Sequence, residues 1–496
     1  MGGEQKAPSG TPGKSLPFTD KQLIDAVQRF PTPFHMYSED GIRSTCRRLK
    51  QAFSWSPSFT NYFAVKATPN PHLLKLLKDE GLGADCSSLA ELMLAESVGL
   101  RGDMIMFTSN NTPINEYQKA KQLGAIINLD DISHIDYLHD SIGLPEFLSF
   151  RYNPGPRRAG NVIIGDPKEA KFGLTRDQLF QAYTKAKQRG VKRFGLHAMV
   201  VSNCTEPSEI VATARMLFEL VVEINKACGV EISMVNLGGG LGVNYKPDQA
   251  EMDVESTAAG VAAEYDKVLK ANGFGAVRVV MENGRFITGP NGFLIARVVH
   301  HKNTYKNYIG LDANMAHLMR PGMYTAYHHV TFVPTPPEAL PKDTPKKRNL
   351  FANKDDTPAD AVGKSMAVYD IVGGLCENND KFAIDRPLPS VPSIGDIAVI
   401  HDAGAHGHSM GFQYNGKLRS AEYLYKVDPA TKDRLVFRRI RRGEKYGDYF
   451  ATIDGIWPGV KMDLPMAAKT LLAIAGAGLC VGAGMLLQCR MAAKQA

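Results

Sequence analysis

Four short stretches of the chain hold side chains that could do chemistry. In the first, "NYFAVKATPN", Lys66 follows the apolar run 62–65, and Pro69 and Pro71 end that strand. A lysine partly removed from water has a lowered pKa and can form a Schiff base with a carbonyl. Taken alone, a lysine at a strand end is more often a surface residue. The other three stretches bear on this choice.

The other stretches supply different groups. The glycines of "NLGGGLGVNY" (236–245) expose backbone amides that suit a phosphate, although a glycine run can also be only a tight turn. "MENGRFITG" (281–289) ends a strand with Glu282 and Arg285, three residues apart. "GGLCENNDKFAIDRPLP" (373–389) places Cys376 beside Glu377 in a polar turn, where a cysteine of an apolar core is not expected.

Strand-like and helical segments alternate between about residues 40 and 300. Apolar strands separated by helices predict a parallel sheet buried on both faces, and the length suits a closed (β/α)8 barrel. In such a barrel, polar residues at the carboxyl ends of strands face the reaction site. The predicted strands are "TNYFAVK", "DMIMFTS", "GAIINL", "EFLSFRYN", "RFGLHAMVV", "SMVNLG" and "VRVVMEN".

After residue 300 the helical period fades into short segments separated by turns, which predicts an antiparallel β-sandwich or β-barrel domain. The predicted organisation is a disordered tail (1–20), a barrel (40–300), a β domain (21–39 and 301–455) with a proline-rich insertion (333–364), and a hydrophobic C-terminal segment (466–490).

Composition excludes several classes of protein. The chain has 496 residues, of which 44% are apolar and 22% charged, as in ordinary globular proteins. The net charge of +7 is scattered and accompanies no nucleic-acid reader motif, so we expect no nucleic acid as partner. The seven cysteines include no CxxC pair, which argues against a disulfide framework or a metal site. With no secretory signal visible, a cytoplasmic catalytic domain is expected.

The C-terminal segment suggests a membrane anchor. Residues 470–487 contain no charge and lie between Lys469 and Arg490, and Gly478 and Gly482 have GxxxG spacing. Eighteen residues are the lower end of what spans a bilayer. A buried helix rich in small residues is the alternative. The expectation is a chain held by its tail to an intracellular membrane.

Nine blocks, taken in order, resemble the fold-type III pyridoxal-phosphate decarboxylases, and among them the diaminopimelate decarboxylases most closely. The resemblance covers about residues 30–455. The blocks are "YFAVKA", "DCSSLAEL", "RYNPG", "KFGL", "GGGLG", "ENGR", "MRPGMYTAYH", "LCENND" and "GAHGHSMGFQYN".

The resemblance implies that pyridoxal 5'-phosphate is the cofactor and assigns residues to it. Lys66 would bind the cofactor covalently, and Glu282 would pair with its pyridine nitrogen and keep the ring an electron sink. Gly239, Gly240 and the backbone near Gly284 would bind the phosphate. The full set implied for the cofactor is Lys66, Asp85, Arg151, His197, Met199, Ser202, Gly239, Gly240, Glu282, Gly284, Arg285, His406 and Tyr414.

The resemblance also implies a homodimer with shared active sites. Cys376 would be the proton donor and would come from the partner subunit. Lys171 and Asp380 of opposite subunits would form an ion pair at the interface.

Charge indicates which amino acid is the substrate. Decarboxylases of ornithine or arginine need acidic groups at the far end of the pocket, because those substrates end in a cation. This chain instead supplies Arg285, Arg320 and Tyr324, which suit a carboxylate, while Glu377 can hold the adjoining ammonium. A substrate that is an amino acid at both ends fits this set. The expected reaction is the decarboxylation of meso-2,6-diaminopimelate to L-lysine and CO2, the last step of lysine biosynthesis.

Four positions depart from the family pattern. In "GLHAMVVSN" His197 is kept, but Met199 stands where a histidine stacks on the cofactor ring, and Val201 stands where the family has a glycine. His406 replaces a tyrosine expected near cofactor and substrate, and Asn283 replaces a proline. Two alternatives therefore stay open: a decarboxylase of another amino acid, of the ornithine or arginine type, and a catalytically inactive regulatory homologue.

Overall fold

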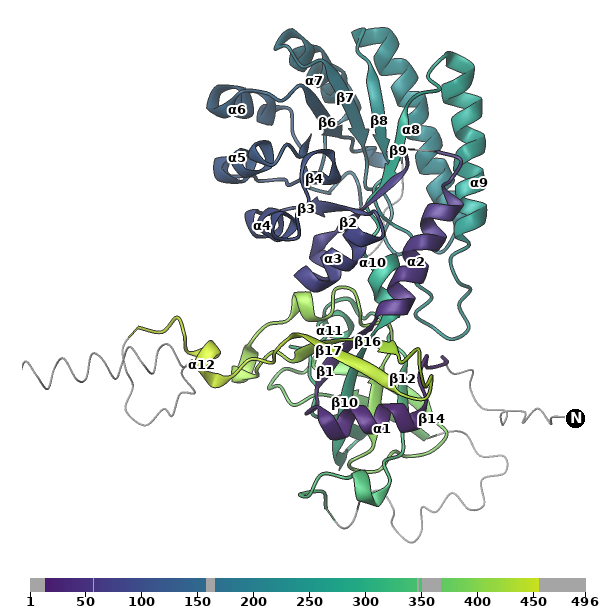
Figure 1. The fold of residues 1–496 in the computed structure, drawn as a ribbon, viewed down its shortest axis with the longest axis vertical. Helices are drawn as coiled ribbons and strands as arrows, with labels where there is room; N and C mark the ends of the chain where they lie inside the picture. Colours follow the sequence, from purple (N-terminus) through teal and green to yellow (C-terminus); the bar gives the residue numbers. More distant parts are fainter. Residues whose placement is uncertain (1–13, 57, 158–165, 346–347, 350–366, 455–496) are drawn as a thin grey trace, which may run out of the picture.

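The computed structural model describes residues 14–56, 58–157, 166–345, 348–349 and 367–454. Eight parallel strands form a closed barrel in sequence order, and the ring closes where Thr60 and Asn61 pair with Val280 and Met281. This confirms the predicted (β/α)8 barrel, which occupies the upper half of Figure 1. Its strands are β2 (Thr60–Ala64), β3 (Gly83–Cys86), β4 (Ile105–Thr108), β5 (Ile126–Leu129), β6 (Phe147–Arg151), β7 (Arg193–His197), β8 (Ile232–Asn236) and β9 (Arg278–Met281).

Helices surround the barrel, and local sequence signals mark where several begin. The Asn70 side chain accepts a hydrogen bond from the backbone amide of His72, and Pro71 occupies the first turn of α3. The side chain of Thr175 caps α7 in the same way. The helices are α2 (Glu39–Ala52), α3 (Pro71–Asp79), α4 (Leu89–Ser97), α5 (Ile114–Gln122), α6 (Ser133–Ile142), α7 (Arg176–Gln188), α8 (Pro207–Cys228), α9 (Val254–Glu264) and α10 (Arg285–Thr288).

One barrel strand was not predicted from the sequence. Strand β3 has only four residues, "GADC", too few to show an apolar run, yet all four are buried and pair with β2 and β4. The spacing between the predicted strands at 60–66 and 103–109 leaves room for it. This strand carries Asp85.

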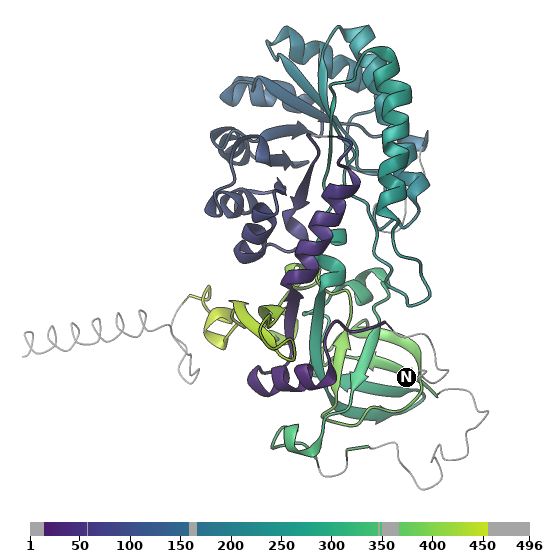
Figure 2. The same cartoon turned by 45° about the vertical axis from the view of Figure 1, so that its right-hand side comes forward.

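The second part of the chain forms a nine-stranded sheet, and the prediction that it is antiparallel was wrong for two pairs. Strand β1 is parallel to β16, and β11 is parallel to β13. Figure 2 shows the sheet curling around its own core. The strands are β1 (Phe34–Ser38), β10 (Gly292–Asn303), β11 (Asn307–Leu311), β12 (Val330–Val333), β13 (Ala367–Val372), β14 (Lys381–Leu388), β15 (Ile397–Ile400), β16 (Ala421–Val427) and β17 (Leu435–Arg441).

The two parts meet at the loop that carries Lys66. The Thr68 hydroxyl donates to the carbonyl of Gly404 at 2.7 Å, and the His406 amide donates to the carbonyl of Ala67 at 2.9 Å. The helix α1 (Asp20–Arg29) packs against the β-sheet part and shares an apolar cluster with β1, β10 and β16 (Figure 1). The β-sheet part therefore fixes the backbone on which the candidate lysine stands.

Several predicted segments lie outside the described residues. They are residues 1–13 of the N-terminal tail, residues 346–347 and 350–364 of the proline-rich insertion, and the hydrophobic segment 466–490. The membrane anchor therefore stays a prediction. Within residues 14–454, as far as they are described, the structure contains no helix both long and apolar enough to span a bilayer.

Candidate active site

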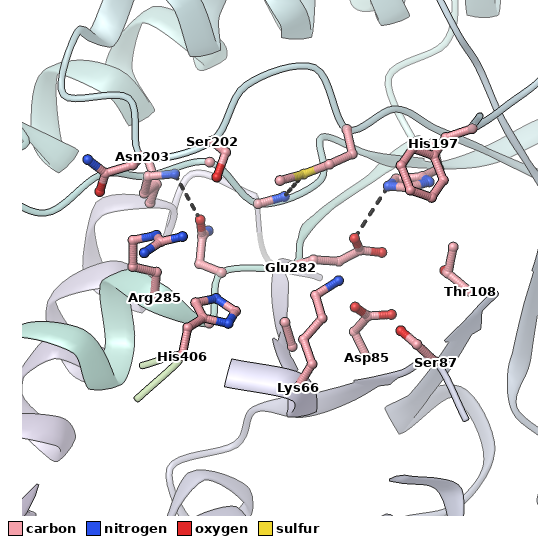
Figure 3. Close-up of a pocket in the computed structure, with 18 of the residues that line it drawn as sticks. Lys66, Asp85, Ser87, Thr108, His197, Ser202, Asn203, Glu282, Arg285 and His406 are labelled. Carbon is pink, nitrogen blue, oxygen red and sulfur yellow. Dashed lines mark hydrogen bonds and ion pairs between the residues drawn. The ribbon is translucent and has the colours of Figure 1, made fainter. Parts of the chain in front are cut away.

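A cavity of about 460 Å3 opens at the carboxyl ends of the barrel strands, where the β-sheet part covers the barrel. Figure 3 shows its polar side chains converging from several strands. Fourteen of the residues predicted for cofactor or substrate line it: Lys66, Asp85, Arg151, His197, Met199, Ser202, Gly239, Gly240, Glu282, Gly284, Arg285, Arg320, Tyr324 and His406.

Lys66 stands on a single 3-10 turn, residues Val65–Ala67, directly after β2. The carbonyl of Ala67 accepts hydrogen bonds from the backbone amide of His406 and, at 3.2 Å, from the Ser409 hydroxyl. The Lys66 side chain is exposed to the cavity, and its ammonium group points toward Glu282 and Asp85 (Figure 3). The turn thus presents the end of the Lys66 side chain to the cavity.

Glu282 follows β9 and is held as an anion. The amide of Asn236 donates to its Oε1 at 2.6 Å, and His197 Nε2 lies 3.3 Å from its Oε2. The Asn128 amide donates to Nδ1 of His197 at 2.9 Å, which leaves Nε2 to face Glu282. Burial acts to raise the pKa of Glu282, but His197, Lys66 and Asn236 outweigh it and hold the pKa well below its usual range.

The surroundings of Asp85 shift the pKa of its carboxyl group in the opposite direction. It is buried at the end of β3, and its Oδ1 has no hydrogen-bond partner among the described residues. Burial, followed by repulsion from Glu282, raises the pKa of Asp85 well above its usual range. The cavity therefore holds two carboxyl groups whose surroundings drive their pKa values apart, one toward the anion and one toward the acid.

The glycine loop lies between β8 and the cavity. Gly238 and Gly240 have φ of 70° and 109°, the left-handed region that favours glycine. A Cβ on Gly240 would lie 2.8 Å from Val201, and one on Gly239 would lie 2.9 Å from the carbonyl of Glu282. Glycine at these positions therefore lets the loop pack closely against Val201 and the end of β9.

Met199 lies against this loop: the backbone amide of Gly239 donates to its Sδ at 3.2 Å. The side chain therefore shields one of the amides expected to bind phosphate.

Asn283 uses atoms that a proline would not have. Its backbone amide donates to Asn61 Oδ1 at 2.9 Å, and its side-chain Oδ1 accepts from the backbone amide of Leu241 at 3.2 Å. Asn61 in turn donates to the carbonyl of Asn283 at 3.0 Å. This departure from the family pattern links β2 to the end of β9 and to the glycine loop.

Two guanidinium groups and an imidazole lie on one side of the cavity. Arg285 and His406 are opposite Thr108 and Ser87 in Figure 3, and Arg320, only 3% exposed, lines the same cavity. Burial and the charges of Arg285, Arg320 and Lys66 lower the pKa of His406 well below its usual range, so its neutral form is favoured. Neither arginine forms an ion pair with a carboxylate in the described part of the chain.

Three predicted site residues do not line the cavity of their own chain. Cys376 and Glu377 are exposed in the loop before β14, and Tyr414 is 49% exposed. The Cys376 amide donates to Asn415 Oδ1 at 2.7 Å, which fixes the loop without directing the thiol inward. The assignment of Cys376 requires a partner subunit, and the roles of all three residues stay predictions.

The predicted ion pair between Lys171 and Asp380 of opposite subunits stays a prediction, since it requires a partner subunit. Asp380 is buried, and its carboxylate accepts hydrogen bonds from the backbone amides of Met315 and Leu375 at 2.6 and 2.7 Å. Its carboxylate thus organises the Cys376 loop of its own chain.

Sequence reasoning missed the residues that support the site. Asn128 and Asn236 lie within β5 and β8, where an amide in an otherwise apolar strand was the available signal. Further cavity residues that were not predicted are Ala64, Ser87, Thr108, Ser109, Asn110, Phe172, Asn203, Leu241, Asn283 and Met410.

These groups fit pyridoxal phosphate. Lys66 offers a primary amine to an aldehyde, the Glu282 anion suits a protonated pyridine nitrogen, and the glycine loop that lines the cavity suits a phosphate. The unpartnered Oδ1 of Asp85 provides a further buried polar atom for a ligand.

Comparison with known proteins agrees with this fit. The family described as "Pyridoxal-dependent decarboxylase, pyridoxal binding domain" matches residues 39–289. Protein TabA of Pseudomonas amygdali pv. tabaci is 41% identical over 431 residues, which are 87% of this chain and 93% of TabA. A diaminopimelate decarboxylase of Methanothermobacter thermautotrophicus is 32% identical and covers 85% of this chain and 93% of its own.

Solved structures show the same fold. Diaminopimelate decarboxylase from M. jannaschii in complex with L-lysine has a TM-score of 0.74 and 28% identity, covering 88% of this chain and 94% of that one. The amine, the anionic carboxylate and the glycine loop thus coincide with a match that spans the barrel. The chain belongs to the pyridoxal-dependent decarboxylases and is a carboxy-lyase with pyridoxal phosphate as its cofactor.

Proposed function

We propose that the chain decarboxylates meso-2,6-diaminopimelate to L-lysine and CO2. The observation that carries the proposal is the pair of guanidiniums, Arg285 and Arg320, which line the cavity without a carboxylate partner in the described residues. Two positive charges, one buried and one half-buried, favour an anion in the cavity that they line. Relatives named diaminopimelate decarboxylase support the same choice, whereas TabA carries a name that states no substrate.

In this proposal, separate residues of the cavity bind separate parts of the cofactor. The cofactor, when bound, accepts the electron pair that CO2 leaves behind. Lys66 holds the cofactor, and the Glu282 anion keeps the proton on the pyridine nitrogen. Gly240 and Ser202 would hold the phosphate, and Gly239 lines the same part of the cavity.

At the other end of the substrate, Arg285, Arg320 and Tyr324 bind the carboxylate that is not lost. Holding this carboxylate orients the opposite α-carbon toward the Lys66 side of the cavity. Binding energy from a part of the substrate that does not react is thus used for orientation.

The proton donor belongs to a homodimer in this proposal. Cys376 and Glu377 are exposed in their own chain, and the loop that bears them is fixed by Asp380 and Asn415. An ordered, solvent-facing loop with a thiol and a carboxylate can complete the cavity of a second subunit. Cys376 then protonates the substrate carbon, and Glu377 holds the distal ammonium.

Decarboxylation of ornithine or arginine is the second candidate. Those substrates would bring a cation toward Arg285 and Arg320, and like charges repel strongly in a cavity of low dielectric. Nothing in the cavity of the described chain supplies two acidic groups on that side, because Asp85 and Glu282 lie on the Lys66 side (Figure 3).

The test is turnover of three substrates by the protein with pyridoxal phosphate, measured as CO2 and amine product. We expect meso-diaminopimelate to react and to give L-lysine, and L-ornithine and L-arginine to react at least about 100-fold more slowly, as expected for an uncompensated buried charge. Faster reaction of ornithine would replace the proposal with the second candidate. No reaction of any substrate would indicate an inactive homologue.

Lys66→Ala is the variant that tests the role of the amine. It should lose both turnover and borohydride-trapped cofactor, whereas Lys75→Ala, which removes an exposed lysine of α3, should keep both. Trapped cofactor in the Lys66→Ala protein would refute the assignment.

A further inference from the structure

Tyr245 lies behind the two guanidiniums and does not line the cavity itself. It ends the stretch that begins with the glycine loop, is 6% exposed, and its backbone amide donates to the carbonyl of Val243 at 3.0 Å. It therefore cannot act on a substrate directly. Its contacts with the two arginines indicate what it does.

A single tyrosine ring contacts both arginines through different parts of its structure. Arg285 donates from Nη1 to the Tyr245 hydroxyl at 2.9 Å. The guanidinium carbon of Arg320 lies over the face of the same ring, 4.5 Å from its centre. The edge of the phenol orients one cation and its π face attracts the other. The ring thus sets the distance between the two cations and the direction in which each points.

His328 completes the wall behind Arg320. Its Nδ1 donates to the carbonyl of His401 at 2.8 Å, which leaves Nε2 as the acceptor for Nη1 of Arg320 at 2.6 Å. The His328 ring meets the Tyr245 ring edge to face, with centres 5.1 Å apart. Arg320 is therefore held on two sides, by an imidazole nitrogen and by an aromatic face.

These supports are all electrically neutral. A carboxylate partner would also fix a guanidinium, but it would cancel its charge. A phenol oxygen, an imidazole nitrogen and a π face fix the two cations while leaving their charge available. Arg320 is 3% exposed, so this charge has little water around it and is directed into the cavity.

We propose that Tyr245 is a positioning residue that orients Arg285 and Arg320 and thereby selects amino acids whose far end is a carboxylate. The proposal rests on the proposed function, because it concerns the same end of the cavity. It adds a residue that does not touch the substrate and a reason for the selectivity. Tyr245→Phe removes the hydroxyl that Arg285 needs and keeps the face, and Tyr245→Leu removes both.

The experiment compares two ligands that differ by one carboxylate. L-Lysine carries a carboxylate that the arginines can bind, and cadaverine is the same diamine without it. Binding of each to the protein loaded with pyridoxal phosphate is measured by calorimetry. We expect the native protein to prefer lysine by at least about 100-fold, the value of a carboxylate bound by two charged hydrogen-bond donors.

The two variants should lose this preference in steps. We expect Tyr245→Phe to lower lysine affinity about 5–10-fold, for one hydrogen bond from a charged donor, and Tyr245→Leu to lower it about 30–100-fold, because the cation–π contact is also lost. Cadaverine affinity should stay within about twofold in both, since its binding does not use the arginines. A merely structural defect would lower both affinities together.

Tyr265→Phe is the matched control. Tyr265 is 5% exposed, and its hydroxyl donates to the carbonyl of Val277 at 2.9 Å, so the variant removes a similarly buried phenol hydroxyl away from the arginines. It should keep the lysine-to-cadaverine ratio of the native protein.

An unchanged ratio in Tyr245→Phe and Tyr245→Leu, with the native preference intact, would overturn the role of Tyr245 alone. A native protein that does not prefer lysine over cadaverine would overturn the proposed function, and this inference with it. If Tyr245→Leu does not fold, Tyr245→Phe decides, because it keeps the ring that packs against Arg320 and His328.

Discussion

Replacing Asn283 with the proline that the family pattern expects should destabilise this protein. The site is well buried, since Asn283 is 2% and Asn61 is 1% exposed. Proline has no backbone amide to donate to Asn61 and no side-chain oxygen to accept from Leu241. The substitution removes four hydrogen bonds, counting those from Asn283 Nδ2 to Asn61 Oδ1 at 3.2 Å and to Met281 Sδ at 3.5 Å.

The size of the effect follows from the groups left without partners. Each neutral hydrogen bond contributes about 1 kcal/mol net, and a buried group left unpaired costs about 1–3 kcal/mol. The Leu241 amide loses its acceptor, and Asn61 Oδ1 loses both of its donors from Asn283. Asn283→Pro should therefore lower the free energy of unfolding by about 3–5 kcal/mol. Asn283→Ala keeps the backbone amide and should cost about 2 kcal/mol.

Urea unfolding of the two variants beside the native protein measures these differences. Asn272→Ala is the control, because Asn272 is exposed and bonds only to the carbonyl of Val268, and it should change stability by less than about 0.5 kcal/mol. A double variant with Asn61→Val should recover part of the loss, since no buried amide oxygen is then left unpaired. The reasoning fails if Asn283→Pro and Asn283→Ala are equally stable and both lie within about 0.5 kcal/mol of the native protein.

Three other predictions concern other parts of the chain. Cys376→Ala should keep bound pyridoxal phosphate by absorbance and lower turnover about 10²–10⁴-fold, the usual value of a proton-transfer group, and unchanged turnover would remove the thiol from the reaction. Burial raises the pKa of Glu422, but His408 and Arg441 outweigh it and hold the pKa at about 2. Because this pKa is lower in the folded chain, the stabilisation is present above the ordinary glutamate range and is lost as pH falls toward about 2. Urea unfolding from pH 7 to pH 3 should therefore show a shallower acid loss in Glu422→Gln than in the native protein, and parallel profiles would contradict the linkage. Removing the residues after Asp463 should release the protein from membranes in fractionation without changing turnover, and an unaltered distribution would count against the anchor.

Local sequence was sufficient for the parts of the fold that repeat. Alternating apolar runs and helices predicted the barrel, because a parallel strand buried on both faces must be apolar along its length. Local sequence did not predict β3, whose four residues show no such run, nor the parallel pairing of β1 with β16. Those residues are about 390 positions apart, as the pairing of Phe34 with Ala421 shows, so no local pattern records which neighbours they have.

Residue types and their order determined the cofactor chemistry of this protein: a lysine at a strand end, a glycine loop and a carboxylate after another strand. Only the tertiary structure decided how those groups are charged and aimed. Asp85 and Glu282 are driven to opposite protonation states by their neighbours, and Tyr245 joins Arg285 to Arg320 through its two surfaces. The reason is physical: a pKa and a direction depend on which atoms lie within a few ångström, and those atoms come from segments far apart in the chain.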